Sequence, residues 1–150
     1  DPIFLDEPST GLDPQARHLI WERLRQLLAQ GKTIFLTTHF MDEAERLAHR
    51  IAIMDHGRII ALGAPRELIA RHIEPQVVEV YGDGAERWGR EFGHSLANRC
   101  EKAGETVFCY AHDTGPLVQN LEQREELRYL HRHANLEDVF LKLTGRELRD

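Results

Sequence analysis

Long apolar runs, cysteine-rich segments and an excess of basic residues are all missing from this 150-residue sequence. No apolar run approaches the ~20 residues that a bilayer-spanning helix needs, so any membrane role would come through a partner. The net charge of −6 argues against a nucleic-acid surface, which is usually basic, and we expect no nucleic-acid partner. Cys100 and Cys109 are the only cysteines, and their spacing matches no zinc motif, so we expect ordinary reduced thiols.

The composition that is present, 41% hydrophobic and 29% charged, is that of a soluble globular protein of one domain or two small ones. Strand and helix signals alternate in the first half, which predicts an α/β fold. Asp13 and Pro14 are typical of a helix start, and Gly31 of a helix end. We expect a strand at 3–5, a helix from 14 to about 30, a central parallel strand at 33–38, a short helix at 41–48, a hairpin of 50–54 and 58–62, and a helix from 65.

The character of the sequence changes near Glu74 and Pro75, and the remainder predicts a small α+β domain. Asn135 is placed to cap a last helix that ends at Gly145. The other expected elements are strands at 77–81, 106–110 and 127–131, and helices at 86–100 and 116–125. The first of these helices is interrupted by Gly89 and Gly93.

Two adjacent carboxylates, Asp6 and Glu7, follow the apolar strand Ile3-Phe-Leu5. Nucleoside-triphosphate hydrolases place one such carboxylate on Mg²⁺ and another beside the attacking water. Adjacent residues of a strand point to opposite sides, so the two groups can serve metal and water separately. We therefore expect Asp6 to be the Mg²⁺ carboxylate, directly or through a water, and Glu7 to be the general base.

Polar residues also follow each of the first two predicted strands. Ser9-Thr-Gly-Leu-Asp13 comes just after the carboxylates, and His39 ends the second strand in Thr-Thr-His-x-x-Asp-Glu-Ala. An imidazole can donate to a phosphate oxygen while its other nitrogen is anchored. Asp42 and Glu43 fall in the first turn of the next helix, where the helix dipole favours anions.

Together these residues resemble the Walker B strand, D-loop and switch histidine of the ATP-binding-cassette (ABC) ATPases. The resemblance implies that residues 1–73 are the C-terminal half of a P-loop, RecA-like nucleotide-binding domain, and residues 74–150 an accessory domain. It implies ATP and Mg²⁺ as cofactors and a γ-phosphate contact for His39. Ser9, Gly11 and Asp13 would form the D-loop, which reaches across a dimer interface, although Asp13 can also serve as an N-cap.

Two motifs of that family do not occur among the 150 residues: the Gly-x-x-x-x-Gly-Lys-Ser/Thr phosphate loop and the Leu-Ser-Gly-Gly signature. The phosphate loop supplies the backbone cradle and the lysine for the β- and γ-phosphates. We therefore interpret the chain as the C-terminal portion of such a subunit, beginning just before its Walker B strand. We expect this portion alone not to bind ATP tightly or hydrolyse it.

The tail Asn135-Leu-Glu-Asp-Val-Phe-Leu-Lys-Leu-Thr-Gly145 is similar to that of ATPases serving ABC-2-type exporters. The segments 79–84, 105–110 and 127–131 look most like the nodulation ATP-binding protein I group, which is linked to export of lipo-chitooligosaccharide signals. This resemblance implies an ABC-2 transmembrane permease and a second copy of the ATPase subunit as partners. It also implies a peripheral location on the cytoplasmic face of the inner membrane.

Other functions stay open at this point. The exported substrate could be a drug or a polysaccharide, and a soluble ABC protein of translation or repair shares the same motifs. A non-catalytic interaction module with vestigial hydrolase residues is an alternative of another class. Replacing Glu7 by Gln separates the last alternative from the others, because only an ATPase would lose turnover.

The remaining histidines and tryptophans point to no chemistry. His131 and His133 would share one side of a strand, but no Cys, Asp or Glu flanks them closely enough to complete a metal site. We expect Trp21 and Trp88 to be packing residues rather than platforms for stacking bases.

Overall fold

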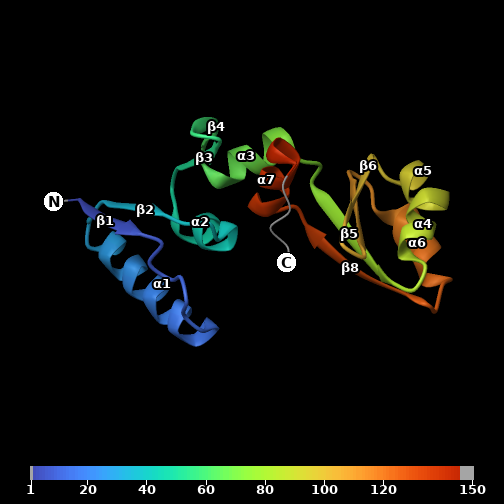
Figure 1. The fold of residues 1–150 in the computed structure, drawn as a ribbon, viewed down its shortest axis with the longest axis horizontal. Coiled ribbons are helices and arrows are strands. Elements are labelled where there is room, and N and C mark those ends of the chain that lie inside the picture. The colour runs from blue at the N-terminus through green and yellow to red at the C-terminus, as the bar shows by residue number, and fades with distance from the viewer. Residues whose placement is uncertain (1, 146–150) are drawn as a thin grey trace.

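The computed structural model describes residues 2–145, which form an elongated molecule with two unlike ends (Figure 1). One end holds a two-stranded sheet and a long helix, the other a four-stranded sheet covered by short helices, and α3 and α7 lie between them. The elements of the N-terminal part are β1 (Ile3–Asp6), α1 (Pro14–Ala29), β2 (Ile34–Thr37), α2 (Met41–Leu47), β3 (Ile51–Asp55), β4 (Arg58–Gly63) and α3 (Pro65–His72).

The strands β1 and β2 are parallel, with Ile3 opposite Ile34, and α1 connects them. The start of α1 is as expected: Asp13 Oδ1 accepts a hydrogen bond from Ala16 N at 2.8 Å, and Pro14 is the first helical residue. The buried helix residues Trp21 and Leu24 pack on the aliphatic face of the pair. That face is formed by Leu5, Ile34 and Leu36.

The opposite face of this sheet is open. Phe4 and Phe35 are 71% and 60% exposed, and their rings contact each other with centroids 5.8 Å apart. A parallel sheet is normally covered on both faces. The parallel pairing expected for the second strand is confirmed, but among the described residues β2 pairs with β1 alone and is not a central strand.

The expected hairpin is confirmed as the antiparallel pair β3 and β4. Its turn uses two residues with positive φ, His56 at 50° and Gly57 at 73°. Ile51 and Ile53 are buried on one side of β3, and β4 carries the exposed Ile59 and Leu62 on its outer side.

The C-terminal sheet has the strand order β6-β7-β5-β8 and is antiparallel throughout. Of its inner strands, β7 is almost entirely buried and β5 is buried at Val77, Val78 and Val80, while β6 and β8 form the edges. The elements of this part are β5 (Gln76–Gly82), α4 (Ala85–Trp88), a π-helix (Gly89–Gly93), α5 (His94–Leu96), β6 (Arg99–Ala103), β7 (Thr106–Ala111), α6 (Gly115–Glu122), β8 (Leu127–His133) and α7 (Leu136–Thr144).

One expectation for this part is wrong. The segment 86–100 is not a helix to its end, because the helical turns stop at Leu96 and Arg99 and Cys100 begin the strand β6. Strand β6 has the sequence Arg-Cys-Glu-Lys-Ala, and charged residues of this kind are common on edge strands but give little strand signal. Its strand structure comes from pairing with β7, a tertiary contact that local sequence does not encode.

Both faces of the C-terminal sheet are packed. Trp88, Leu117 and Leu121 from α4 and α6 cover one face, and both expected packing tryptophans, Trp21 and Trp88, are buried. The other face packs against α3 and α7 through a core that also includes Ile51 and Ile53 of β3. The hydrophobic core therefore continues across the proposed domain boundary near residue 74.

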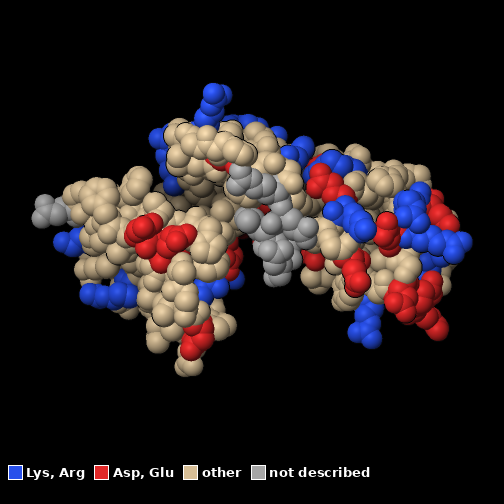
Figure 2. Space-filling view, in the orientation of Figure 1, with Lys and Arg blue, Asp and Glu red and all other residues tan. Residues whose placement is uncertain are grey.

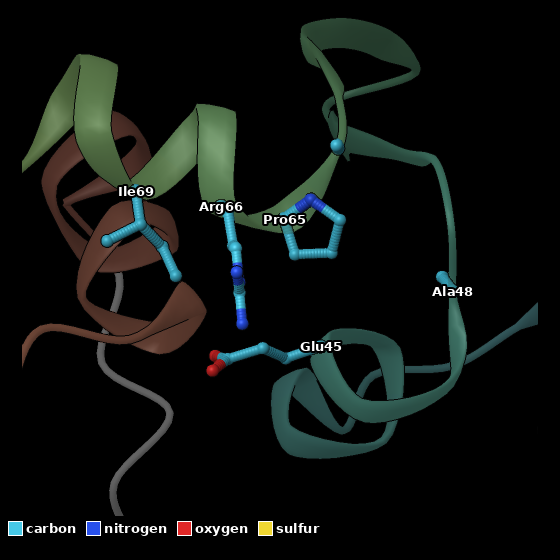
Figure 3. A pocket seen from close by; sticks show the side chains of 6 residues that line it. Glu45, Ala48, Pro65, Arg66 and Ile69 are labelled. Carbon is cyan, nitrogen blue, oxygen red and sulfur yellow. The ribbon is translucent and has the colours of Figure 1, made fainter.

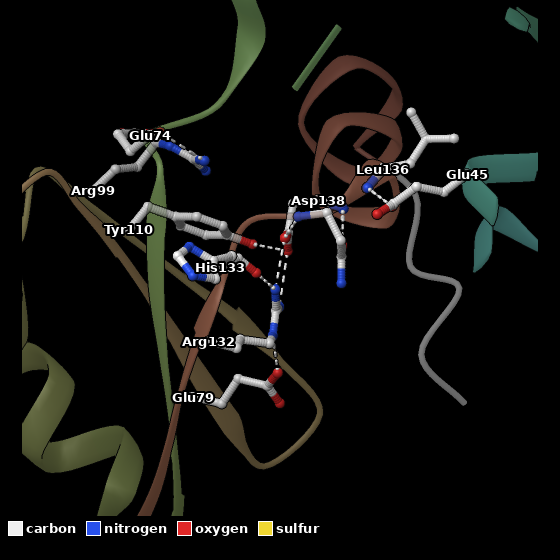
Figure 4. Close-up of polar contacts among 10 residues, drawn as sticks. Glu45, Glu74, Glu79, Arg99, Tyr110, Arg132, His133, Leu136 and Asp138 are labelled. Atoms are coloured by element: carbon white, nitrogen blue, oxygen red, sulfur yellow. Dashed lines mark hydrogen bonds and ion pairs between the residues drawn. The ribbon is translucent and has the colours of Figure 1, made fainter. Parts of the chain in front are cut away.

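A buried ion-pair network fastens α7 to this sheet (Figure 4). Asp138 is 1% exposed, and its carboxylate accepts hydrogen bonds from Arg132 at 2.8 and 3.0 Å and from the Tyr110 hydroxyl at 3.2 Å. Arg132 also pairs with Glu79. Burial lowers the pKa of Arg132, but its ion pairs with Asp138 and Glu79 outweigh this and raise it. The same Asp138 closes a capping box with Asn135, as expected for the helix start.

Two hydrogen bonds join α7 to the N-terminal part. Glu45 Oε1 of α2 accepts from Leu136 N at 2.7 Å, and Lys142 Nζ donates to the His72 carbonyl at 2.7 Å. Beside this junction, a pocket of about 410 Å³ lies between α2 and α3, with the side chains of Glu45 and Arg66 pointing toward one another (Figure 3).

The charged surface carries both signs. In Figure 2, basic and acidic side chains are intermingled over the C-terminal sheet, with no basic stripe on the face shown. Within residues 2–145, no helix combines the length and the apolar character needed to span a bilayer.

Replacing Asp138 by Ala should lower the free energy of unfolding by about 3 kcal/mol, because Arg132 loses a buried partner and the Asn135 backbone N–H loses its acceptor in the capping box. Denaturant unfolding followed by circular dichroism measures this. Glu122→Ala, which removes an exposed carboxylate of α6, is the matched control and should change stability by about 0.5 kcal/mol or less. Equal effects of the two substitutions would contradict a structural role for the network.

Candidate functional site

Polar residues gather where the parallel strands β1 and β2 end. Asp6 lies opposite Thr37, and Glu7 N donates to the Thr37 carbonyl at 2.8 Å. The pairing therefore continues one step past β1 and places Glu7 beside the residues that follow β2. Carboxyl ends of parallel strands are where α/β proteins bind ligands.

Asp6 is oriented from the neighbouring strand, because the Thr37 hydroxyl donates a hydrogen bond to Asp6 Oδ1. Among residues 2–145, no group of three or more His, Cys, Asp or Glu side chains could enclose a metal ion. A site with one carboxylate suits Mg²⁺, which keeps several waters and takes its remaining ligands from a phosphate substrate. Asp6 with Thr37 beside it fits that use and does not fit a metal held by protein ligands alone.

Glu7 has a backbone that non-glycine residues seldom adopt, with φ of 47°. Its carbonyl accepts from Thr10 N at 3.2 Å, so the chain turns sharply directly after β1. The turn takes the Glu7 side chain out of the strand alternation and toward His39, where Glu7 Oε1 lies 2.5 Å from His39 Nδ1. Backbone strain of this kind is often found at functional sites.

This contact with Glu7 orients the His39 ring. An ionised carboxylate only accepts hydrogen bonds, so with Glu7 ionised this contact requires the tautomer of His39 that carries a proton on Nδ1. The Nε2 atom is then left for a ligand, and a protonated ring can donate from both nitrogens. Both side chains are about half exposed, at 55% for His39 and 43% for Glu7, so the site is open to solvent.

Residues 9–13 follow these groups directly in the chain, and they differ from one another in burial and in backbone conformation. Ser9 is 1% exposed, and its Oγ has no hydrogen-bond partner within the described chain. Gly11 has φ of 81°, a conformation that favours glycine, and Asp13 uses its side chain to cap α1. The structure thus brings together Asp6, Glu7 and His39, while Gly11 and Asp13 are exposed on the turn that leads into α1.

Helix α1 supports the histidine from behind, through contacts that the sequence analysis did not identify. Arg17 stacks on the Phe40 ring at 4.5 Å and pairs with Asp42 at 3.4 Å, and the Phe40 ring contacts that of His39 at 4.2 Å. The ion pair between Arg17 and Asp42 could not be predicted from the sequence, because the two residues lie far apart along the chain.

A buried hydrogen bond holds α2 on α1. Trp21 Nε1 donates to Glu43 Oε2 at 2.7 Å, and the two side chains are 2% and 0% exposed. From sequence, Glu43 was expected only to favour the helix dipole and Trp21 only to pack. Their contact fixes the start of α2, which follows His39 directly.

Comparison with known proteins agrees with this reading of the chain. Residues 86–145 match the family described as nodulation factor export protein NodI, C-terminal domain. The whole chain aligns with "Nod factor export ATP-binding protein I" of Ralstonia nicotianae at 61% identity and with that of Paraburkholderia xenovorans at 59%. These alignments cover 48% and 49% of the two relatives, so the chain spans about half of their length.

A solved structure described as the ATP binding subunit of an ABC transporter matches 47% of this chain and 29% of its own. The sequence identity is 36% and the TM-score 0.42, too low a score to establish a shared fold.

The chain is similar to the ATP-binding subunits of ABC transporters. Within that class, it resembles the Nod factor export ATP-binding proteins over its whole length. This confirms the resemblance drawn from the Walker B segment and from the tail. The roles of the individual site residues stay predictions.

Replacing Trp21 by Phe should lower the free energy of unfolding by about 2 kcal/mol, because buried Glu43 then loses its hydrogen-bond donor. Denaturant unfolding is the measurement, and Leu19→Ala is the control, since Leu19 is 64% exposed on the same helix. A combined Trp21→Phe, Glu43→Leu variant should recover part of the loss, because no polar group is then left unpaired. Failure of the second change to recover any stability would argue against the hydrogen bond as the cause.

Proposed function

We propose that this chain is the catalytic C-terminal portion of an ATPase subunit of an ABC-2-type exporter. The observation that carries the proposal is the assembly of Asp6, Glu7 and His39 at the ends of two parallel strands, with Glu7 and His39 in hydrogen-bond contact. ATP hydrolysis needs three groups close together: a carboxylate that binds the metal, a carboxylate that activates the water, and a side chain that contacts the phosphate.

The geometry supports a separate role for each of Asp6, Glu7 and His39. Asp6, oriented by Thr37, would hold Mg²⁺ directly or through a water. Bound Mg²⁺ would neutralise charge on the phosphates. Glu7 accepts the proton of the attacking water or polarises it, and the doubly protonated ring of His39 donates from Nε2 to a γ-phosphate oxygen. The Glu7–His39 hydrogen bond would hold both side chains near the same phosphate group.

Gly11 and Asp13 are proposed to act at the interface with a second copy of the subunit, whereas Ser9 of the same segment is buried and would hold the turn from within. Gly11 and Asp13 are exposed on the same turn, which leaves them accessible to such a partner. ATP that binds the closed pair better than the open pair shifts the population toward closure. An ABC-2 permease, on whose cytoplasmic face the subunit would sit, would use that closure to move its cargo.

The cargo is proposed from the relatives alone. Relatives at about 60% identity are named for Nod factor export, so a lipo-chitooligosaccharide is the first candidate substrate. A drug or a polysaccharide remains the alternative cargo, because no residue of this portion is expected to touch the substrate. We also propose no nucleic-acid partner, in keeping with the net charge of −6.

Glu7→Gln in a full-length subunit that contains this chain should lower steady-state ATP hydrolysis by about 10²- to 10⁴-fold and leave ATP binding intact. The reason is that the amide cannot accept a proton from water, while it still fills the same space. Phosphate release and nucleotide-dependent dimerisation are the measurements. Glu22→Gln, an exposed residue of α1, is the matched control. Unchanged turnover in Glu7→Gln would favour a non-catalytic interaction module.

The 150 residues by themselves should not bind Mg·ATP with a submicromolar dissociation constant, because they contain no phosphate loop and no loop lysine. Isothermal titration calorimetry with purified chain measures this. Joining the chain to a segment that supplies the phosphate loop should restore binding. Tight binding by the chain alone would show that another cradle for the phosphates exists.

A further inference from the structure

The two cysteines of the sequence, which the ATPase site does not use, face each other in the C-terminal sheet. Cys100 of β6 lies directly opposite Cys109 of β7 in the antiparallel ladder. Their sulfur atoms are 3.2 Å apart, within hydrogen-bond distance for a thiol, and both cysteines are free. Cys109 is fully buried, whereas Cys100 is partly exposed.

The π-helix above the sheet closes one side of the thiol pair. A side-chain carbon placed on Gly93 would lie 3.3 Å from Cys100 Sγ and 3.5 Å from Cys109 Sγ. The same carbon would be 3.2 Å from the Trp88 ring, so Gly93 is in close contact with all three groups. The π-helix backbone at Gly93 therefore packs closely against both sulfur atoms. Short π-helical segments often occur at functional sites.

The other side of Cys100 opens on a small cavity. Its volume is about 170 Å³, enough for a small polar molecule, and Cys100 lines it together with Val107 and Gly89. The charged groups around it are of both signs, with Lys102 paired to Glu86 at 3.0 Å. The titratable residues that line the cavity are Glu86, Arg90, His94, Glu101 and Lys102.

The two thiols have unlike acidity. The hydrogen bond with Cys109 lowers the pKa of the Cys100 thiol and outweighs its burial, with a smaller contribution from Arg99. The same hydrogen bond, with burial, raises the pKa of Cys109 far above its ordinary value. The accessible thiol is thus the one that ionises more readily, and the thiolate is the nucleophilic form.

We propose that Cys100 is an oxidation site for peroxides and that Cys109 resolves the oxidised product into an intramolecular disulfide. The Cys100 thiolate attacks one oxygen of hydrogen peroxide, the O–O bond breaks, and the leaving hydroxide takes a proton to form water. The sulfenic acid formed on Cys100 is then attacked by the sulfur of Cys109, which gives up its proton. The S–O bond breaks and a second water leaves, so two thiols are oxidised while one peroxide is reduced.

The sheet geometry allows this bond with little movement. Directly opposite residues of an antiparallel pair have Cα atoms about 4.5 to 5.5 Å apart, which falls within the range of disulfides. A bond would tie the edge strand β6, which within residues 2–145 pairs with β7 alone, to the buried middle of the sheet. The proposal concerns the C-terminal part alone and does not depend on ATP hydrolysis.

The test treats purified protein with hydrogen peroxide, blocks remaining thiols with iodoacetamide under denaturing conditions, and maps peptides without reduction. Trypsin cuts after Arg99, Lys102 and Arg124, so the two cysteines fall in different peptides and a bridge joins them. We expect the linked pair within one chain, its loss on adding dithiothreitol, and a rise in melting temperature of the oxidised protein. Untouched thiols, or bridges only between chains, would overturn the proposal.

Single variants separate the two roles. Cys109→Ser should accumulate a dimedone-reactive sulfenic acid at Cys100, because the resolving thiol is absent. Cys100→Ser should leave Cys109 unmodified in the folded protein, because Cys109 is fully buried. Thermal unfolding of both variants checks that they are folded. Equal reactivity of Cys109 and Cys100 in folded single variants would contradict the assignment.

Discussion

Parallel pairing of β1 with β2 is the constraint on which the candidate site depends. Because Asp6 lies opposite Thr37, the residues that follow the two strands emerge at one edge of the sheet, and Glu7 meets His39 there. A one-residue slip of this register would turn the Asp6 side chain to the opposite face of the sheet. The aliphatic contacts of α1 with one face of the pair hold the register.

Two buried polar interactions hold helices in place behind that edge and on the C-terminal sheet. Trp21 and Glu43 fasten α2 behind His39, and Arg132 with Asp138 fastens α7 to the C-terminal sheet. Glu45 links the two arrangements through its hydrogen bond with Leu136 N. A movement of α2 would therefore be transmitted to the start of α7, which gives the C-terminal part a physical connection to the edge where Glu7 meets His39.

Much of this arrangement followed from local sequence, and the exceptions have a common cause. The cap at Asp13, the hairpin around His56 and the cap at Asn135 are short-range features, and all three were predicted correctly. Strand β6 was missed because its charged residues become a strand only by pairing with β7. Phe4 and Phe35 are exposed, although the apolar pattern of their strands is typical of strands that are buried on both faces.

The sequence by itself determined which groups are available: the carboxylates Asp6 and Glu7, the histidine His39, and a resemblance to ABC ATP-binding subunits that the relatives confirm. Tertiary structure alone decided which of them meet. The contact of Glu7 with His39 and that of Cys100 with Cys109 each join residues of different strands, and strand pairing is set by packing of the whole sheet. Motifs specify chemistry locally, but distances between motifs are fixed only when the core forms.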